Sequence, residues 1–181
     1  MAESNRMRGC KTGSGTYSRL RSIAFRLELL GLVAFAASQL LRLAVSQPES
    51  EGEGFFSDIP LAVLSTLLLL SWVGSGFAAG LALLKSPMES HIGRVAQQLA
   101  AVNVLLLPVA WALSWLLTPI GMGFSVGWGM PFFPVWAASG LGAICAGLWT
   151  PMDRRRGQLL IPLLLGAGLL TFFLGDMVPA P

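Results

Sequence analysis

Long apolar runs without a charged side chain constrain this sequence more than any other feature. Residues 60–84 contain no Asp, Glu, Lys or Arg, and about 20 apolar residues in a helix cross the roughly 30 Å hydrocarbon core of a bilayer. Of the 181 residues, 54% are hydrophobic and 12% are charged, about half the charged fraction of an ordinary soluble domain. The sequence therefore predicts an all-α integral membrane protein.

Five apolar segments predict five transmembrane helices. Their expected bounds are 23–45, 60–84, 95–117, 132–149 and 159–174. The last two are close to the shortest length that spans a bilayer. We expect two regions in the chain: a basic, flexible cytoplasmic tail over residues 1–21, and a transmembrane helical domain over residues 22–181.

Segment 23–45 is the weakest of the five predicted spans. Its charge-free part, residues 29–41, is flanked by Glu28 and Arg42, and a run of this length is ambiguous as a span. A basic N-terminus, a short apolar run and small residues at 44–46 also fit a cleaved signal peptide. A retained span and a cleaved signal both remain open at this point.

The basic residues predict the orientation of the chain. All Lys and Arg residues except Arg42 lie in the N-terminal region through Arg26, in the 85–94 connection or in the 154–156 connection. These three regions fall on one side of a five-span chain, which the positive-inside rule makes cytoplasmic. We therefore expect the N-terminus inside and the C-terminus outside. The membrane expected is a bacterial inner membrane, with an organelle membrane as the other option.

The same distribution accounts for the formal net charge of +3. Short basic tracts beside apolar segments are typical of membrane orientation, so we expect no nucleic-acid partner. The partners expected are the lipid bilayer and, through helix packing, other membrane subunits or a second copy of the chain.

An internal repeat is visible when the sequence is shifted by 64 residues. Residues 72–93 read WVGSGFAAGLALLKSPMESHIG, and residues 136–157 read WAASGLGAICAGLWTPMDRRRG. The shared Trp and the later [ST]-P-M-[DE] run are the least common of these matches. We interpret the last four spans as two duplicated helical hairpins that run in the same direction, which is a parallel repeat.

Each copy of the repeated motif predicts a tight cytoplasmic turn. The hydroxyl residue of the motif would cap a helix, the proline would take the first helical position, and the carboxylate would take the third, which is a capping box. The residues expected to act as helix-hairpin caps are Ser86, Pro87, Glu89, Thr150, Pro151 and Asp153. A structural role is favoured over a catalytic one.

Several polar residues fall inside the predicted spans. They are Glu28, Gln39, Arg42, Asn103 and Ser114. Polar side chains within a membrane are by default candidates for function. The competing interpretation is that Glu28 and Arg42 reach the headgroups while Asn103 bonds to a neighbouring helix.

Small residues in the second span predict close helix contact. Gly76 and Gly80 form a GxxxG pattern, which lets two helix backbones approach each other. The pattern is common in apolar helices, and it indicates packing or self-association.

The sequence lacks the usual residues of a reaction centre. His91 is the single histidine, and Cys10 and Cys145 lie in unrelated segments, so neither a haem with two axial histidines nor a Cys-based zinc site can be assembled. We predict no catalytic, cofactor-binding or metal-binding residues and no enzymatic activity. The expected function is that of an accessory, scaffold or assembly subunit, and the alternative is a small transporter or channel protomer built from the two hairpins.

Overall fold

The structure of the chain is a computed structural model that describes residues 3–45, 54–117 and 132–177. Its elements are α1 (Glu3–Val45), α2 (Gly54–Lys85), α3 (His91–Leu117), α5 (Phe132–Trp149), α6 (Arg154–Gly157) and α7 (Leu160–Met177). No strand occurs within these described ranges, which confirms the all-helical prediction there. A helix suits such apolar segments because it satisfies its own backbone hydrogen bonds.

Four helical stretches are long and apolar enough to cross a membrane. They are Gly15–Ala44, Ile59–Lys85, His91–Ala110 and Phe132–Trp149. The fifth predicted segment also forms a helix, α7, of 18 residues. The acidic connection at 46–53, the neutral connection at 118–131 and the last residue of the alternative cleavage site, Ser46, lie outside the described residues.

Helix α1 extends beyond the first predicted span. The structure begins it at Glu3, so residues expected to form a flexible tail continue the helix instead. Residues 3–21 contain no proline, and adding a residue to a nucleated helix costs far less than starting one.

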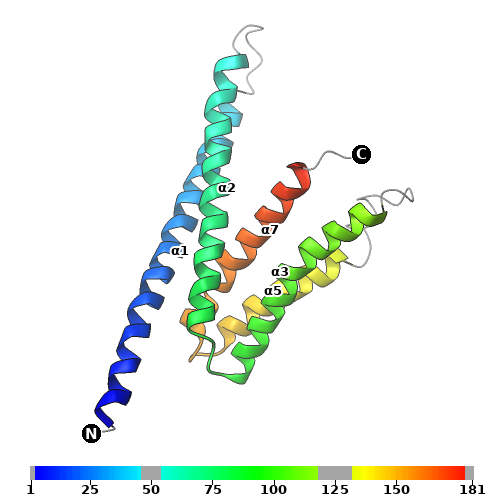
Figure 1. Cartoon of the computed structure of the whole chain (residues 1–181). Coiled ribbons are helices and arrows are strands. Elements are labelled where there is room, and N and C mark those ends of the chain that lie inside the picture. Colours follow the sequence, from blue (N-terminus) through cyan, green and yellow to red (C-terminus); the bar gives the residue numbers. More distant parts are fainter. Residues whose placement is uncertain (1–2, 46–53, 118–131, 178–181) are drawn as a thin grey trace.

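The helices form two pairs joined by α7. Helix α1 packs along α2, α3 packs along α5, and α7 packs mainly against α2 with a smaller contact on α3. The two pairs converge where α2 turns into α3 and where α6 lies, and they diverge toward the opposite end (Figure 1). Helix α7 therefore holds the two pairs together.

This pairing differs from the two hairpins that the sequence predicts. Helices α5 and α7, consecutive in the repeat, have a small contact, whereas the extensive contacts are α2 with α7 and α3 with α5. The reason lies in the turns, because residues 86–90 form a non-helical link that lets α3 leave α2. In terms of the predicted repeat, each first helix packs against the second helix of the other copy.

Small side chains form most of the core. Its fully or almost fully buried alanines are Ala24, Ala78, Ala79, Ala82, Ala96, Ala100 and Ala143. Small residues allow helix backbones to approach closely, which is how helices associate in lipid, where the surrounding solvent is as apolar as the side chains.

Candidate functional site

The closest approach between α2 and α7 lies at a pair of glycines. A Cβ atom placed on Gly76 would lie 2.9 Å from the Cα atom of Gly166 and 3.0 Å from the carbonyl oxygen of Pro162. Both are backbone atoms that cannot move aside. On the same face, a Cβ atom on Gly80 would lie 3.2 Å from Cδ1 of Leu163. The structure therefore uses Gly76 and Gly80 within the chain, for packing α2 against α7.

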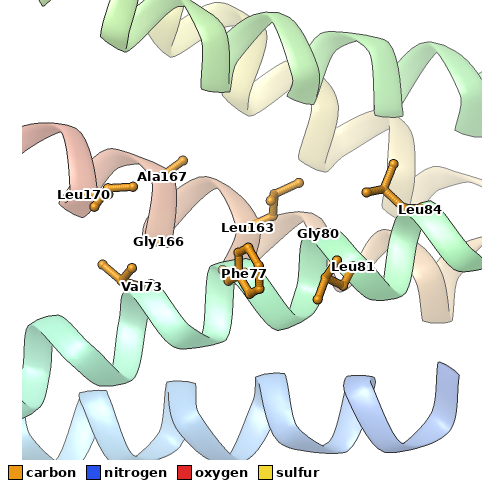
Figure 2. A pocket seen from close by; sticks show the side chains of 10 residues that line it. Val73, Phe77, Gly80, Leu81, Leu84, Leu163, Gly166, Ala167 and Leu170 are labelled. Carbon is orange, nitrogen blue, oxygen red and sulfur yellow. The ribbon is translucent and has the colours of Figure 1, made fainter. Parts of the chain in front are cut away.

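Beside this contact, α2 and α7 form an apolar groove of about 250 Å³. Figure 2 shows its side chains along the two helices, with Leu84 at one end and Val73 and Leu170 toward the other. Phe77 and Leu84 are 70% and 78% exposed. The groove carries no polar side chain among its lining residues, so it fits an apolar ligand.

A buried carboxylate joins the two turns at the convergent end of the molecule. Asp153 has no exposed surface. Its Oδ1 atom accepts the backbone N–H of Glu89 at 3.0 Å, and its Oδ2 atom accepts the backbone N–H of Ser90 at 2.9 Å and a hydrogen bond from the Ser90 hydroxyl. Arg156 places Nη1 3.8 Å from Oδ1. We call Glu89, Ser90, Asp153 and Arg156 the Asp153 cluster.

These donors set the charge of the Asp153 carboxylate. Burial by itself raises the pKa of a carboxyl group. Here the Ser90 hydroxyl, the backbone N–H groups of Glu89 and Ser90 and the nearby Arg156 guanidinium outweigh burial, so the pKa of Asp153 lies below its ordinary value. Asp153 is therefore ionised at neutral pH.

The Asp153 cluster replaces the capping boxes predicted at Ser86 and Thr150. Helix α3 begins at His91, not at Pro87, and its N-terminal cap is Ser90, whose hydroxyl oxygen accepts the N–H of Gly93 at 2.9 Å. The Asp153 carboxylate holds the N–H groups of Glu89 and Ser90 outside the helix.

The second predicted box is also absent. The Thr150 hydroxyl donates back to the carbonyl oxygen of Ala146 at 3.5 Å. The turn after it passes through Pro151, and α6 begins at Arg154. Asp153 is the N-cap residue of α6, but its side chain makes no capping hydrogen bond there, because its carboxylate bonds across the molecule.

Arg156 connects this cluster to the turn that contains Pro87 and Glu89. Its Nη2 atom lies 2.8 Å from Oε1 of Glu89, and its Nη1 atom donates to the carbonyl oxygen of Pro87 at 2.9 Å. Glu89 and Pro87 thus contribute to the turn as acceptors for Arg156. Arg156 and Ser90 were not among the predicted site residues, because nothing in their own sequence spacing shows which carboxylate they face.

A second polar contact joins α3 to α5. Asn103, 2% exposed, donates from Nδ2 to the carbonyl oxygen of Trp136 and to the hydroxyl of Ser139, the latter at 3.1 Å. The Oδ1 atom of Asn103 is buried and has no hydrogen-bond partner among the described residues. Gly140 leaves room for this amide, since a Cβ atom there would lie 2.9 Å from Nδ2.

The polar residues predicted on the first span do not gather in one enclosed site. Glu28 is half-buried, whereas Gln39 and Arg42 are exposed. The contact of α1 with α2 uses other groups: the Ser75 hydroxyl donates to the carbonyl oxygen of Ala24 at 2.7 Å, and the Trp72 indole donates to that of Glu28 at 3.3 Å.

Two further observations bear on the predicted site residues. The side chain of Ser114 lies outside the described residues. Within the described parts of the chain, no group of three His, Cys, Asp or Glu side chains is placed to hold a metal ion.

Comparison with known proteins identifies no relative of this chain. No protein-family model, curated protein or solved structure matches the chain.

Proposed function

We propose that the chain spans a bacterial inner membrane five times, with the N-terminus in the cytoplasm and the C-terminus outside. Helix α7 supports the fifth span, because its 18 residues extend about 27 Å at 1.5 Å per residue. The turns that hold Lys85, Arg154 and Arg155 lie at one end of the molecule (Figure 1), where the positive-inside rule predicts the cytoplasm.

The four long helices after α1, which are α2, α3, α5 and α7, represent, in this proposal, a duplicated pair. Support comes from the exchanged pairing, since α2 packs on α7 while its repeat counterpart α5 packs on α3. The contact points correspond to within one residue. Gly76 faces Gly166, and its counterpart Gly140 faces Asn103, which aligns with residue 167 under the 64-residue shift.

We infer that the protein functions as an accessory, scaffold or assembly subunit through helix packing. The observation that carries this proposal is the identity of the hydrogen-bond partners of the buried polar side chains. Ser75, Asn103 and Asp153 each form a hydrogen bond to the backbone of another helix or turn of the same chain. These hydrogen bonds stabilise packing within the chain. Large apolar side chains on α1, such as Leu29 and Val33, are exposed and available to lipid or to a partner helix.

Copurification tests this proposal. The tagged full-length chain is extracted in mild detergent and analysed by size-exclusion chromatography and mass spectrometry. We expect one membrane subunit to copurify reproducibly with the chain in stoichiometric amount, in a complex larger than the monomer. A variant with Leu29→Trp and Val33→Trp on α1 should lose that subunit, while Val135→Trp at an exposed site of α5 should retain it. A monomer without a stoichiometric partner would contradict the proposal.

One observation favours a transporter or channel protomer as a second candidate. The Oδ1 atom of Asn103 is a buried acceptor without a partner among the described residues, and polar groups at the interface of parallel repeats form sites in some transporters. Proteoliposomes loaded with pH- and Na⁺-sensitive dyes test it. Flux of H⁺ or Na⁺ that Asn103→Leu abolishes, and Leu105→Asn does not, would favour this function; no flux would exclude transport of these two ions.

A further inference from the structure

The apolar groove between α2 and α7 leads to a basic side chain. Leu81 lines the groove, and Lys85, the last residue of α2, follows it by four positions. Residues four apart lie on the same face of a helix, so Lys85 continues the groove face. The Lys85 side chain is exposed. The groove thus has apolar walls and a cation where it reaches the end of α2.

The length of the groove matches one leaflet of a bilayer. From Val73 to Leu84 its α2 wall extends about 16 Å at 1.5 Å per residue, and half of a hydrocarbon core is about 15 Å. On α7 the lining residues Leu163, Gly166, Ala167 and Leu170 follow helical spacing and form the opposite wall.

Other charges at this end add to the attraction for anions. Arg154 and Arg155 are exposed on α6, at the same end of the molecule as Lys85 (Figure 1). The carboxylates at this end are already engaged, because Glu89 bonds to Arg156 and Asp153 is enclosed by donors. Basic side chains at a membrane surface attract anionic headgroups.

We propose that the groove binds one acyl chain of an anionic phospholipid, whose headgroup lies at Lys85. Phe77 and Leu84 flank the chain at the exposed edge, and Gly76 and Gly80 give the groove its depth. The site needs α2 and α7 in a membrane, and it is independent of the accessory role; only the assignment to the cytoplasmic leaflet rests on the proposed orientation.

The width of the occupant and the packing of α2 favour an acyl chain over a helix of a second copy. An acyl chain is narrower than a helix, which is about 10 Å across with its side chains, and the groove holds about 250 Å³. The small-residue face of α2 is also occupied, since Gly76 and Gly80 lie against Gly166 and Leu163 of α7.

Native mass spectrometry of the delipidated full chain tests the proposal, with phosphatidylglycerol and phosphatidylcholine of equal acyl length added in equal amounts. We expect one phosphatidylglycerol to remain bound in preference to phosphatidylcholine. Equal retention of both lipids, no retained lipid, or a dimer in place of lipid binding would overturn the proposal.

Two matched pairs of variants locate the site. Lys85→Gln should weaken phosphatidylglycerol binding about fivefold, the effect expected of one basic side chain at a membrane surface, whereas Arg94→Gln, an exposed position on α3, should leave it unchanged. Val73→Trp should fill the groove and abolish retention, whereas Val63→Trp, at a 61% exposed site of α2, should not. Equal effects within either pair would contradict the proposed site.

A measurement on the unmodified chain covers the case in which Val73→Trp does not fold. Phosphatidylglycerol with a photoreactive group on its acyl chain is reconstituted with the protein and crosslinked. Crosslinks concentrated at Phe77, Leu84 and Leu170 support the site. Crosslinks spread evenly over the exposed faces of α1, α3 and α5 would overturn it. Neither readout involves a partner protein. A negative result would therefore overturn lipid binding in the groove without affecting the assembly proposal, which the copurification experiment tests.

Discussion

At Asp153 a single carboxylate connects two turns that are far apart in the sequence. Burying a charge without partners is costly, and this carboxylate is stabilised by two backbone N–H groups, the Ser90 hydroxyl and Arg156. Three of these donors lie immediately before α3, next to its N-terminus, where the helix dipole favours a negative charge. Asp153 therefore fixes α3 relative to the turn that precedes α7.

Replacing this carboxylate by an amide tests its structural role. Asp153→Asn keeps the shape but removes the charge and brings an N–H₂ group toward donors, so we expect a loss of about 1–3 kcal/mol in the free energy of unfolding. The measurement is SDS-induced unfolding in mixed micelles, followed by circular dichroism.

Glu89→Gln is the matched control for Asp153→Asn. Glu89 is 60% exposed in its ion pair with Arg156, and exposed pairs contribute about 0–1 kcal/mol. If Glu89→Gln lowered the free energy of unfolding as much as Asp153→Asn, burial of the carboxylate would not matter for stability.

The lowered pKa of Asp153 predicts a pH dependence of stability. The folded state favours the ionised form, so this contribution is complete above the ordinary carboxyl value of 3.8 and is lost as the pH falls through the lower pKa of the folded state. Thermal unfolding in detergent between pH 7 and pH 2.5 should show a loss of stability below about pH 4. In Asp153→Asn this component should be missing, and an identical profile for both proteins would refute the assignment.

At the scale of elements, α7 is held by backbone contact at glycine. A Cβ atom on Gly166 would lie 2.6 Å from the carbonyl oxygen of Trp72 and 2.7 Å from Cα of Gly76. Two residues further along, a Cβ atom on Gly168 would have its nearest neighbour, a ring carbon of Trp136, at 3.9 Å. Gly168 therefore has room for a Cβ atom, whereas Gly166 has none.

This difference gives a prediction within α7. Gly166→Ala should force α2 and α7 apart and lower the free energy of unfolding by about 1–3 kcal/mol. Gly168→Ala should leave stability unchanged or raise it by up to about 1 kcal/mol, because alanine is the better helix former. Both are measured by the same SDS titration, and equal losses at the two positions would mean that α7 does not contact α2 at Gly166.

The element bounds follow from the sequence more closely than the contacts do. Apolar runs gave helices at the expected places, and the span 132–149 coincides with α5, since a charged or proline-containing stretch of sequence follows each run. The pairing of helices was missed because apolar composition does not show which faces meet. The turns differed from the predicted capping boxes because Asp153 bonds to Glu89 and Ser90, a contact that local spacing cannot show.

At the scale of the whole molecule, the structure combines two helix pairs that converge at one end and a fifth helix that joins them (Figure 1). Its exposed surface includes many large apolar side chains, among them Leu40, Phe77, Leu116 and Leu141. An extensive apolar surface of this kind is stable when lipid surrounds it. In the proposed orientation, the basic turns at the convergent end face the cytoplasm.

The most direct test of this account is the accessibility of single cysteines in intact cells. The chain is prepared with Cys10→Ala and Cys145→Ala, with one new cysteine at Arg155 or at Pro181, and is labelled with a membrane-impermeant maleimide. We expect the cysteine at position 181 to react in intact cells, and the cysteine at position 155 to react only after permeabilisation. Equal reaction of both positions in intact cells, or the reverse pattern, would contradict a five-span chain with its basic turns in the cytoplasm.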